Sequence, residues 1–324
     1  MPLDLLSLRL IYIRRIVVTL AHTLGWARAM AFARWLARGV FDLNTPARRR
    51  AADNLSQAYG DELTPEQRDR LARDVFEHIA AFWVEAFFAR RKLRISSWRR
   101  FVSFDDEPAV RSLAESPRGA LLVTAYLGNL AVGAYALGQV CRPLYVVIDE
   151  AEHPVLRSWQ DELYRQPNLE FLPRQRAGAQ TADLLSAGQK VLIVGEHPRR
   201  HGRAIELDYL GQSWPCYPTV GVLARWCNVP VHTVAARRLP GEFRFAVSVG
   251  PAVDPVDLAD GEDPAEAITQ RYMAGLEAAI RRWPDQYLWT HGWGAETARA
   301  AVAADDRTPS HGRAEDSPTA LRGE

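Results

Sequence analysis

Short apolar runs alternate with amphipathic stretches along the second half of the chain. Aliphatic runs bounded by turn residues are typical of buried strands, and apolar residues three and four apart indicate one face of a helix. The pattern predicts strands over residues 120–125, 144–148, 169–172, 190–195, 230–236 and 243–249. It predicts helices over residues 130–140, 154–165, 177–187, 217–227 and 264–282. This alternation favours an α/β fold, with a mixed, mostly parallel sheet flanked by helices.

The segment before this region is predicted to be helical. Thr45-Pro46 and Thr64-Pro65-Glu66-Gln67 are helix-start signals, the second with Thr as N-cap and Gln at the third helical position. The apolar residues that follow the second signal are spaced for one helix face: Leu71, Val75, Phe76, Ile79, Phe82 and Trp83.

The first 44 residues mix aliphatic and aromatic side chains with arginines. No cleavable signal peptide is visible, and His22 and Arg28 interrupt the most apolar window, so a membrane span is not favoured. A basic amphipathic element that lies in a membrane interface fits this composition. The alternative is that the segment packs on the protein's own core with its arginines in solvent.

These features predict three parts of the chain. Residues 1–44 form a helical, membrane-associating segment, and residues 45–297 form the α/β domain, with a helical part over 45–118 and the sheet core over 119–297. Residues 298–324 contain almost no large apolar side chain and are predicted to be a disordered tail.

Charge and cysteine content exclude several classes of function. The formal net charge of +1 argues against a nucleic-acid-binding surface over the whole molecule. Three cysteines without paired spacing indicate neither a disulfide framework nor a zinc site, and no metal or cofactor is expected. No glycine-rich nucleotide-binding pattern follows any predicted strand.

One stretch, residues 119–131, combines a buried strand, a turn at Leu127-Gly128-Asn129 and the start of a helix. Together with Arg48-Arg49-Arg50-Ala51 and Asn54-Leu55, and with the string from Pro284 to Trp289 and His291, it resembles the lipid A biosynthesis (lauroyl/myristoyl-type) acyltransferases of the lysophospholipid acyltransferase superfamily. The resemblance covers residues 10–293 and is strongest over 119–235. It implies acyl transfer from an acyl carrier protein or acyl-CoA to a lipid or lipid-like acceptor, at the cytoplasmic face of the inner membrane.

The family's catalytic dyad is absent from the matching positions. In the family a His is the general base, and an acidic residue five positions later orients it. Tyr126 stands at the His position and Ala131 at the acid position. An unperturbed phenol titrates near ~10 and is a poor base at neutral pH, so Tyr126 is either an oxyanion donor or a packing residue. Gly128 and Asn129 keep the turn, which the resemblance places beside the substrate.

A second candidate site follows the strand at 190–195. Glu196 and His197 occupy the place of the family's Asp-Gln, and Arg199, Arg200 and Arg203 follow them. Three guanidiniums favour an anion site for a phosphorylated lipid or for the phosphopantetheine of a carrier, although a solvated loop is the alternative. His197 is also a candidate replacement base, with Glu196 or Glu206 as its partner, although adjacent side chains of an extended chain point apart.

The third candidate is the C-terminal string. Trp289 and His291 match the family, whereas Gly292 and Trp293 replace two arginines, and Asp149 stands where relatives tend to have Arg. These changes leave two hypotheses open. One is a divergent acyltransferase with a different acceptor and a base supplied elsewhere. The other is a pseudoenzyme that binds an acyl chain or acyl carrier and acts with a partner.

Overall fold

The computed structural model describes residues 5–43, 45–149, 157, 160, 166–199, 204–259 and 261–291. Within them, seven strands form one sheet in the order β1-β9-β8-β2-β5-β3-β4. Neighbouring strands are parallel, except that β8 and β9 are antiparallel. The strands are β1 Val102–Phe104, β2 Ala120–Gly128, β3 Leu144–Ile148, β4 Leu169–Pro173, β5 Lys190–Val194, β8 Val231–Arg238 and β9 Phe245–Val249. The predicted mixed, mostly parallel sheet is therefore confirmed.

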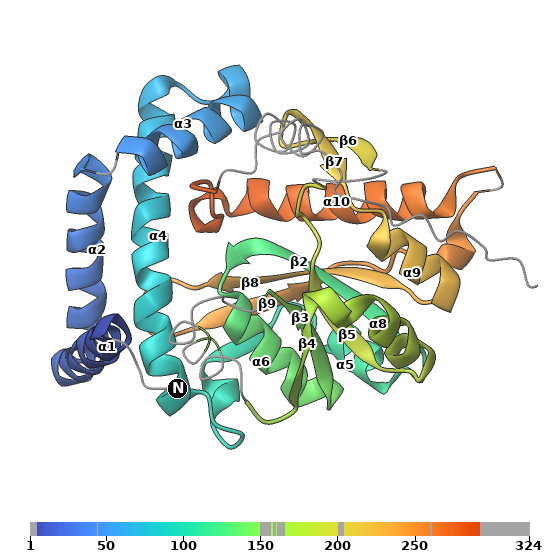
Figure 1. Ribbon diagram of the computed structural model, residues 1–324, viewed down its shortest axis with the longest axis horizontal. Helices are drawn as coiled ribbons and strands as arrows, with labels where there is room; N and C mark the ends of the chain where they lie inside the picture. Colours follow the sequence, from blue (N-terminus) through green and yellow to red (C-terminus); the bar gives the residue numbers. More distant parts are fainter. Residues whose placement is uncertain are drawn as a thin grey trace, which may run out of the picture.

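Helices cover both faces of this sheet (Figure 1). Alternate residues of β2 belong to different cores, because successive side chains of a strand point to opposite faces. Leu121 and Val123 pack in the core beneath α8 (Ala177–Ser186), α9 (Thr219–Cys227) and α10 (Pro264–Arg282). Leu122 packs on the other side, with α5 (Glu107–Glu115) and α6 (Leu130–Cys141). Strand β2, which is fourth in the order of seven strands, is therefore buried between the two cores.

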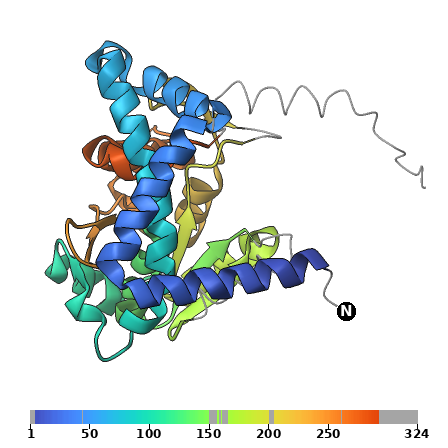
Figure 2. The same cartoon turned by 90° about the vertical axis from the view of Figure 1, so that its left-hand side faces the viewer.

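The N-terminal helices stand at one side of the sheet domain (Figure 1). They are α1 (Leu5–Leu24), α2 (Trp26–Leu43), α3 (Thr45–Tyr59) and α4 (Pro65–Lys92), and α4 packs against the other three. The predicted capping box at Thr64 and Gln67 is present at the start of α4. Figure 2 shows α1 running across the direction of α2 and α4.

Helices α1 and α2 expose many large apolar side chains. Trp35 is 67% exposed and Ile16 is 58% exposed, and the others are Tyr12, Ile13, Val17, Leu20, Leu24, Phe32, Leu36, Val40 and Leu43. No helix in the described part of the chain is both long enough and apolar enough to cross a membrane.

The remaining elements are short. A hairpin of β6 (Ile205–Tyr209) and β7 (Gln212–Cys216) lies outside the main sheet, and neither it nor β1 was predicted. Single 3₁₀ turns occur at Gly60–Glu62, Trp98–Arg100, Arg174–Arg176, Pro255–Asp257 and Pro284–Gln286. The helix predicted over 154–165, of which only Arg157 and Gln160 are described, and the tail predicted over 298–324 lie outside the described residues. The division into residues 1–44, 45–297 and 298–324 stays a prediction.

Candidate active site

The turn after β2 is fixed by its backbone. Gly128 has φ +67°, and a Cβ at this position would lie 2.0 Å from the carbonyl oxygen of Ala236 on β8. The Asn129 N–H donates to the same oxygen at 2.7 Å. The Asn129 side chain then caps α6, because its Oδ1 accepts from the Val132 N–H at 3.1 Å. Both residues therefore shape the turn, as their sequence pattern predicts, and the Asn129 side chain is buried.

A buried polar cluster anchors this turn to α4. The Asn129 amide donates to Glu85 Oε2 at 2.7 Å, and Glu85 is also paired with the Nε of Arg238. Arg238 Nη1 lies 3.1 Å from His78 Nδ1. Burial, together with the charge of Arg238, holds the pKa of His78 well below its usual value. The pairing of Glu85 with Arg238 was not predicted.

The peptide of Tyr126 is held from both sides. Its N–H donates to Glu196 Oε1 at 2.6 Å, and its carbonyl accepts from the Leu288 N–H at 3.1 Å. The other oxygen of Glu196 accepts from the hydroxyls of Tyr209 at 3.1 Å and Tyr287 at 2.7 Å. Burial raises the pKa of Glu196 to about 7, against the opposing effect of these hydrogen bonds. Glu196 is an interior residue that positions Tyr126.

His197, the next residue, lies in a groove at the carboxyl ends of β2, β3 and β5. Its ring centroid lies 5.6 Å from that of Tyr126, and its Nε2 lies 3.5 Å from Asp149 Oδ2. The adjacent side chains of Glu196 and His197 thus serve different environments, as expected for an extended chain. Glu206, the other partner considered for His197, lies on β6 and accepts from the Ser213 hydroxyl at 2.9 Å.

We call this cavity the sheet groove; its volume is about 410 Å³. Its polar end holds Tyr126, Asp149 and His197, and its walls are mainly apolar. The apolar wall residues are Leu130, Val146, Val147, Ile148, Ala177, Leu192, Ile193, Val194, Val220 and Leu223. A cavity with a long apolar wall and a polar end suits an acyl chain that carries its reactive carbonyl at the end.

Cations gather beside this polar end. Arg174 Nη1 lies 2.8 Å from Asp149 Oδ2, and its guanidinium carbon is 5.7 Å from the centre of the Tyr217 ring. Arg199 lies over the same ring at 5.0 Å, and its Nε has no hydrogen-bond partner among the described residues. Arg174 was not predicted, and the two other arginines of the predicted anion site, Arg200 and Arg203, lie outside the described residues.

The C-terminal string, Pro284 to His291, contacts both α3 and Tyr126. Asn54 donates to the carbonyls of Trp289 at 2.7 Å and His291 at 3.0 Å, so two motifs distant in sequence meet in space. Trp289 is buried and donates through its indole N–H to Pro284. The His291 ring lies 5.4 Å from that of Tyr126, and burial, with a smaller effect of Arg50, lowers the pKa of His291.

The part of the chain that the structure describes contains no metal site, and two of its three cysteines are unreactive thiols. No group of three or more His, Cys, Asp or Glu residues there could hold a metal ion. Cys141, Cys216 and Cys227 are free thiols. Burial raises the pKa of Cys141 to about 11 and that of Cys216 to about 12, so both are protonated at neutral pH.

The groove lies at the carboxyl ends of the sheet strands, where α/β proteins commonly bind their ligands. The family model described as bacterial lipid A biosynthesis acyltransferase matches residues 3–292. The chain therefore belongs to the bacterial lipid A biosynthesis acyltransferase family, as its motifs predicted.

Comparisons with curated proteins and solved structures add little about the function. No curated protein matches the chain. One solved structure similar to it is the 1-acyl-sn-glycerophosphate (LPA) acyltransferase PlsC from Thermotoga maritima, with 14% sequence identity and a TM-score of 0.36. That match covers 78% of this chain and 96% of the other. The likeness is too distant to support an inference about substrates.

Proposed function

We propose that this family member transfers a fatty acyl group from a thioester donor to a hydroxyl or amine of a lipid or lipid-like acceptor, with His197 as the base that the missing dyad would have supplied. The donor is an acyl carrier protein or acyl-CoA. The observation that carries the proposal is the position of His197, which faces Tyr126 in the sheet groove with Asp149 3.5 Å from its Nε2.

The proposed reaction needs one proton transfer in each direction. The imidazole of His197, with Asp149 beside its Nε2, takes the proton of the acceptor as the acceptor's oxygen or nitrogen attacks the thioester carbonyl. The tetrahedral intermediate collapses when the carbon–sulfur bond breaks. The thiolate then takes the proton from His197. The distance of 3.5 Å is longer than a good hydrogen bond, and catalytic contacts often tighten only when substrate binds.

Tyr126 and the nearby cations complete the proposal. The peptide of Tyr126 is fixed by Glu196 and Leu288, so its side chain is a preorganised candidate donor to the oxyanion. Arg199 is the described member of the predicted anion site and suits a phosphate of the donor or acceptor. Gly128, Asn129 and Trp289 act indirectly in this proposal, because they hold the turn and the string around the groove, while His291 borders the Tyr126 ring.

The proposed location is the cytoplasmic face of the inner membrane. The exposed apolar side chains of α1 and α2, interspersed with arginines, support attachment at the lipid interface. The reaction also favours this location, because a lipid acceptor is delivered from a bilayer.

The test is acceptor-dependent loss of the acyl group from loaded acyl carrier protein and from acyl-CoA, followed by mass spectrometry. His197→Ala is expected to lower kcat by roughly 10²- to 10⁴-fold, because that is the usual contribution of a general base. Asp149→Asn should lower kcat less, and Tyr126→Phe should lower kcat with little change in KM. His232→Gln is the matched control, since His232 lies near the amino end of β8 and its Nδ1 is 3.0 Å from the Gly250 carbonyl oxygen. Full activity in His197→Ala would refute the assignment of the base.

The alternative function is an acyl-binding pseudoenzyme. The observation in its favour is that Asp149 lies closer to Arg174, at 2.8 Å, than to His197. A carboxylate held by Arg174 orients His197 less strongly. Tight binding of loaded acyl carrier protein, without turnover with any acceptor, would favour this alternative.

A further inference from the structure

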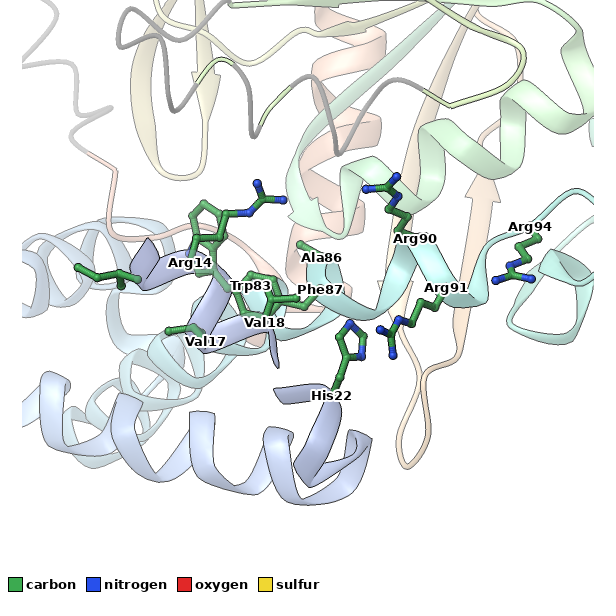
Figure 3. A pocket seen from close by; sticks show the side chains of 11 residues that line it. Arg14, Val17, Val18, His22, Trp83, Ala86, Phe87, Arg90, Arg91 and Arg94 are labelled. Carbon is green, nitrogen blue, oxygen red and sulfur yellow. The ribbon is translucent and has the colours of Figure 1, made fainter. Parts of the chain in front are cut away.

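A second cavity lies between α1 and α4, on the side of α4 that carries Trp83, and we call it the helix groove (Figure 3). Its volume is about 620 Å³. Its floor is apolar, and Trp83 within it is 47% exposed. The lining residues are Ile13, Arg14, Val17, Val18, His22, Trp83, Ala86, Phe87, Arg90, Arg91 and Arg94.

The charges of this groove are all of one sign. Four of its lining residues are arginines, and no lining residue is acidic. Arg90, Arg91 and Arg94 are exposed and form no ion pair with other described residues. Figure 3 shows these three along the end of α4, with Arg14 contributed by α1 near Trp83.

Helix stabilisation accounts for only part of this arrangement. Cations in the last turn of a helix interact favourably with its dipole, which explains Arg90 and Arg91. That effect does not require Arg14, which belongs to another helix, or Arg94, which follows the end of α4. It also gives no reason for an apolar cavity that is lined by four arginines and stays open.

We propose that the helix groove binds one molecule of an anionic phospholipid, with an acyl chain on the apolar floor and the phosphate on the arginines. A guanidinium can donate two parallel hydrogen bonds to the oxygens of one phosphate. The volume of the cavity is within the range of small-molecule ligand sites. Ile13 and Val17 belong both to the groove and to the exposed apolar face of α1, so the groove opens onto the surface from which a membrane lipid would enter.

This site is separate from the sheet groove, and it does not depend on acyl transfer. The two cavities share no lining residue. The bound lipid would act as a headgroup-selective ligand that orients the protein on an anionic bilayer. General attachment through apolar side chains would not distinguish one headgroup from another.

The experiment uses the full chain and vesicles of phosphatidylcholine that contain a minor fraction of phosphatidylglycerol with brominated acyl chains. Bromine quenches tryptophan fluorescence at short range, so a chain in the groove should quench Trp83. The readout is the part of the quenching that is lost in Trp83→Phe, because other tryptophans such as Trp35 on α2 also face the lipid interface in our proposal. We expect this part to saturate with brominated phosphatidylglycerol and to be much weaker with brominated phosphatidylcholine. An equal Trp83-dependent part of the quenching with the two lipids would overturn the proposal.

Two matched triple variants test the charges. Arg90→Gln, Arg91→Gln and Arg94→Gln together should weaken the apparent affinity for phosphatidylglycerol about a hundredfold, at about fivefold for each cation. The control neutralises three exposed arginines on other helices, Arg49, Arg111 and Arg225, and should retain most of the affinity. An equal loss in both triple variants would show a diffuse charge effect and refute a discrete site.

Soluble ligands distinguish a phospholipid from free phosphate or an acidic protein as the occupant of the helix groove. Dihexanoyl phosphatidylglycerol below its micelle concentration should bind and should lose affinity in Ala86→Trp, which fills the floor. Inorganic phosphate alone should bind far more weakly. Binding of an acidic protein to the helix groove, without any binding of the short-chain lipid, would contradict the proposal and assign the groove to a protein partner.

Discussion

Glu196→Gln tests the role of the buried carboxyl behind Tyr126. In the folded protein the pKa of Glu196 is about 7, against an ordinary value of 4.5, because burial penalises its charged form. Glutamine removes the charge and keeps a carbonyl that accepts from the Tyr126 N–H. The perturbation therefore changes the ionisation and leaves the shape of the site largely intact.

The magnitude follows from the shift of the pKa. The folded value lies above the unfolded value, so the contribution of Glu196 to stability is fully present below about pH 4.5 and is lost as pH rises through about 7. A shift from 4.5 to about 7 corresponds to roughly 3 kcal/mol, at 1.36 kcal/mol per pKa unit. Relative to Glu196→Gln, the natural protein should therefore lose roughly 3 kcal/mol of unfolding free energy between these pH values.

The assay is urea unfolding of both proteins at several pH values from 4.5 to 8. The other ionisable groups are the same in both chains, so their effects cancel in the difference between the two free energies. A difference that stays constant across this range would refute the raised pKa, and a difference of the opposite sign would show that hydrogen bonds to the carboxylate outweigh its burial. Activity should change little, because Glu196 acts on the Tyr126 peptide and does not contact substrate in our proposal.

Two further substitutions test the turn and the cluster beneath it. Gly128→Ala should destabilise the fold by about 3 kcal/mol or more in urea unfolding, because the new Cβ would lie 2.0 Å from the Ala236 carbonyl oxygen. The control is Gly25→Ala, which also has a positive φ but lies in open space and should cost about 1 kcal/mol. Arg238→Met should cost about 3–5 kcal/mol by the same measurement, because it leaves Glu85 buried without its cation. Adding Glu85→Gln should restore part of that loss, and strictly additive effects would contradict the pairing.

Hydropathy patterns predicted the strands because most of them contain an apolar run, and the runs of β2 and β5 are buried on both faces of the sheet. All six predicted strands are present, with ends that differ by a few residues. The hairpin of β6 and β7 was missed because the prediction relied on continuous apolar runs. Strand β6 instead alternates apolar and polar residues around Leu207, which is also a strand signal. Strand β1 is only three residues long and has no pattern of its own.

The parts of the site that involve neighbours in space could not be predicted. The sequence indicated His197 as a candidate base, but its nearest described carboxylate belongs to Asp149, at the end of another strand. Parallel strands that end at one edge of the sheet could have suggested this pair, because Asp149 and His197 each follow a predicted strand. The interior position of Glu196 had no such signal, since it depends on hydroxyls of Tyr209 and Tyr287 from distant segments.

The hydrogen bond from Leu288 to Tyr126 has a consequence for the order in which the molecule is assembled. Tyr126, the candidate oxyanion donor, has two backbone restraints, and one of them comes from Leu288, close to the end of the described chain. During synthesis, the sheet strands emerge from the ribosome well before that restraint exists. Until the C-terminal string docks on α3, the core beneath α10 lacks Tyr287 and Trp289, and the Tyr126 peptide lacks one of its restraints. The core and the proposed site are therefore completed in the same late step.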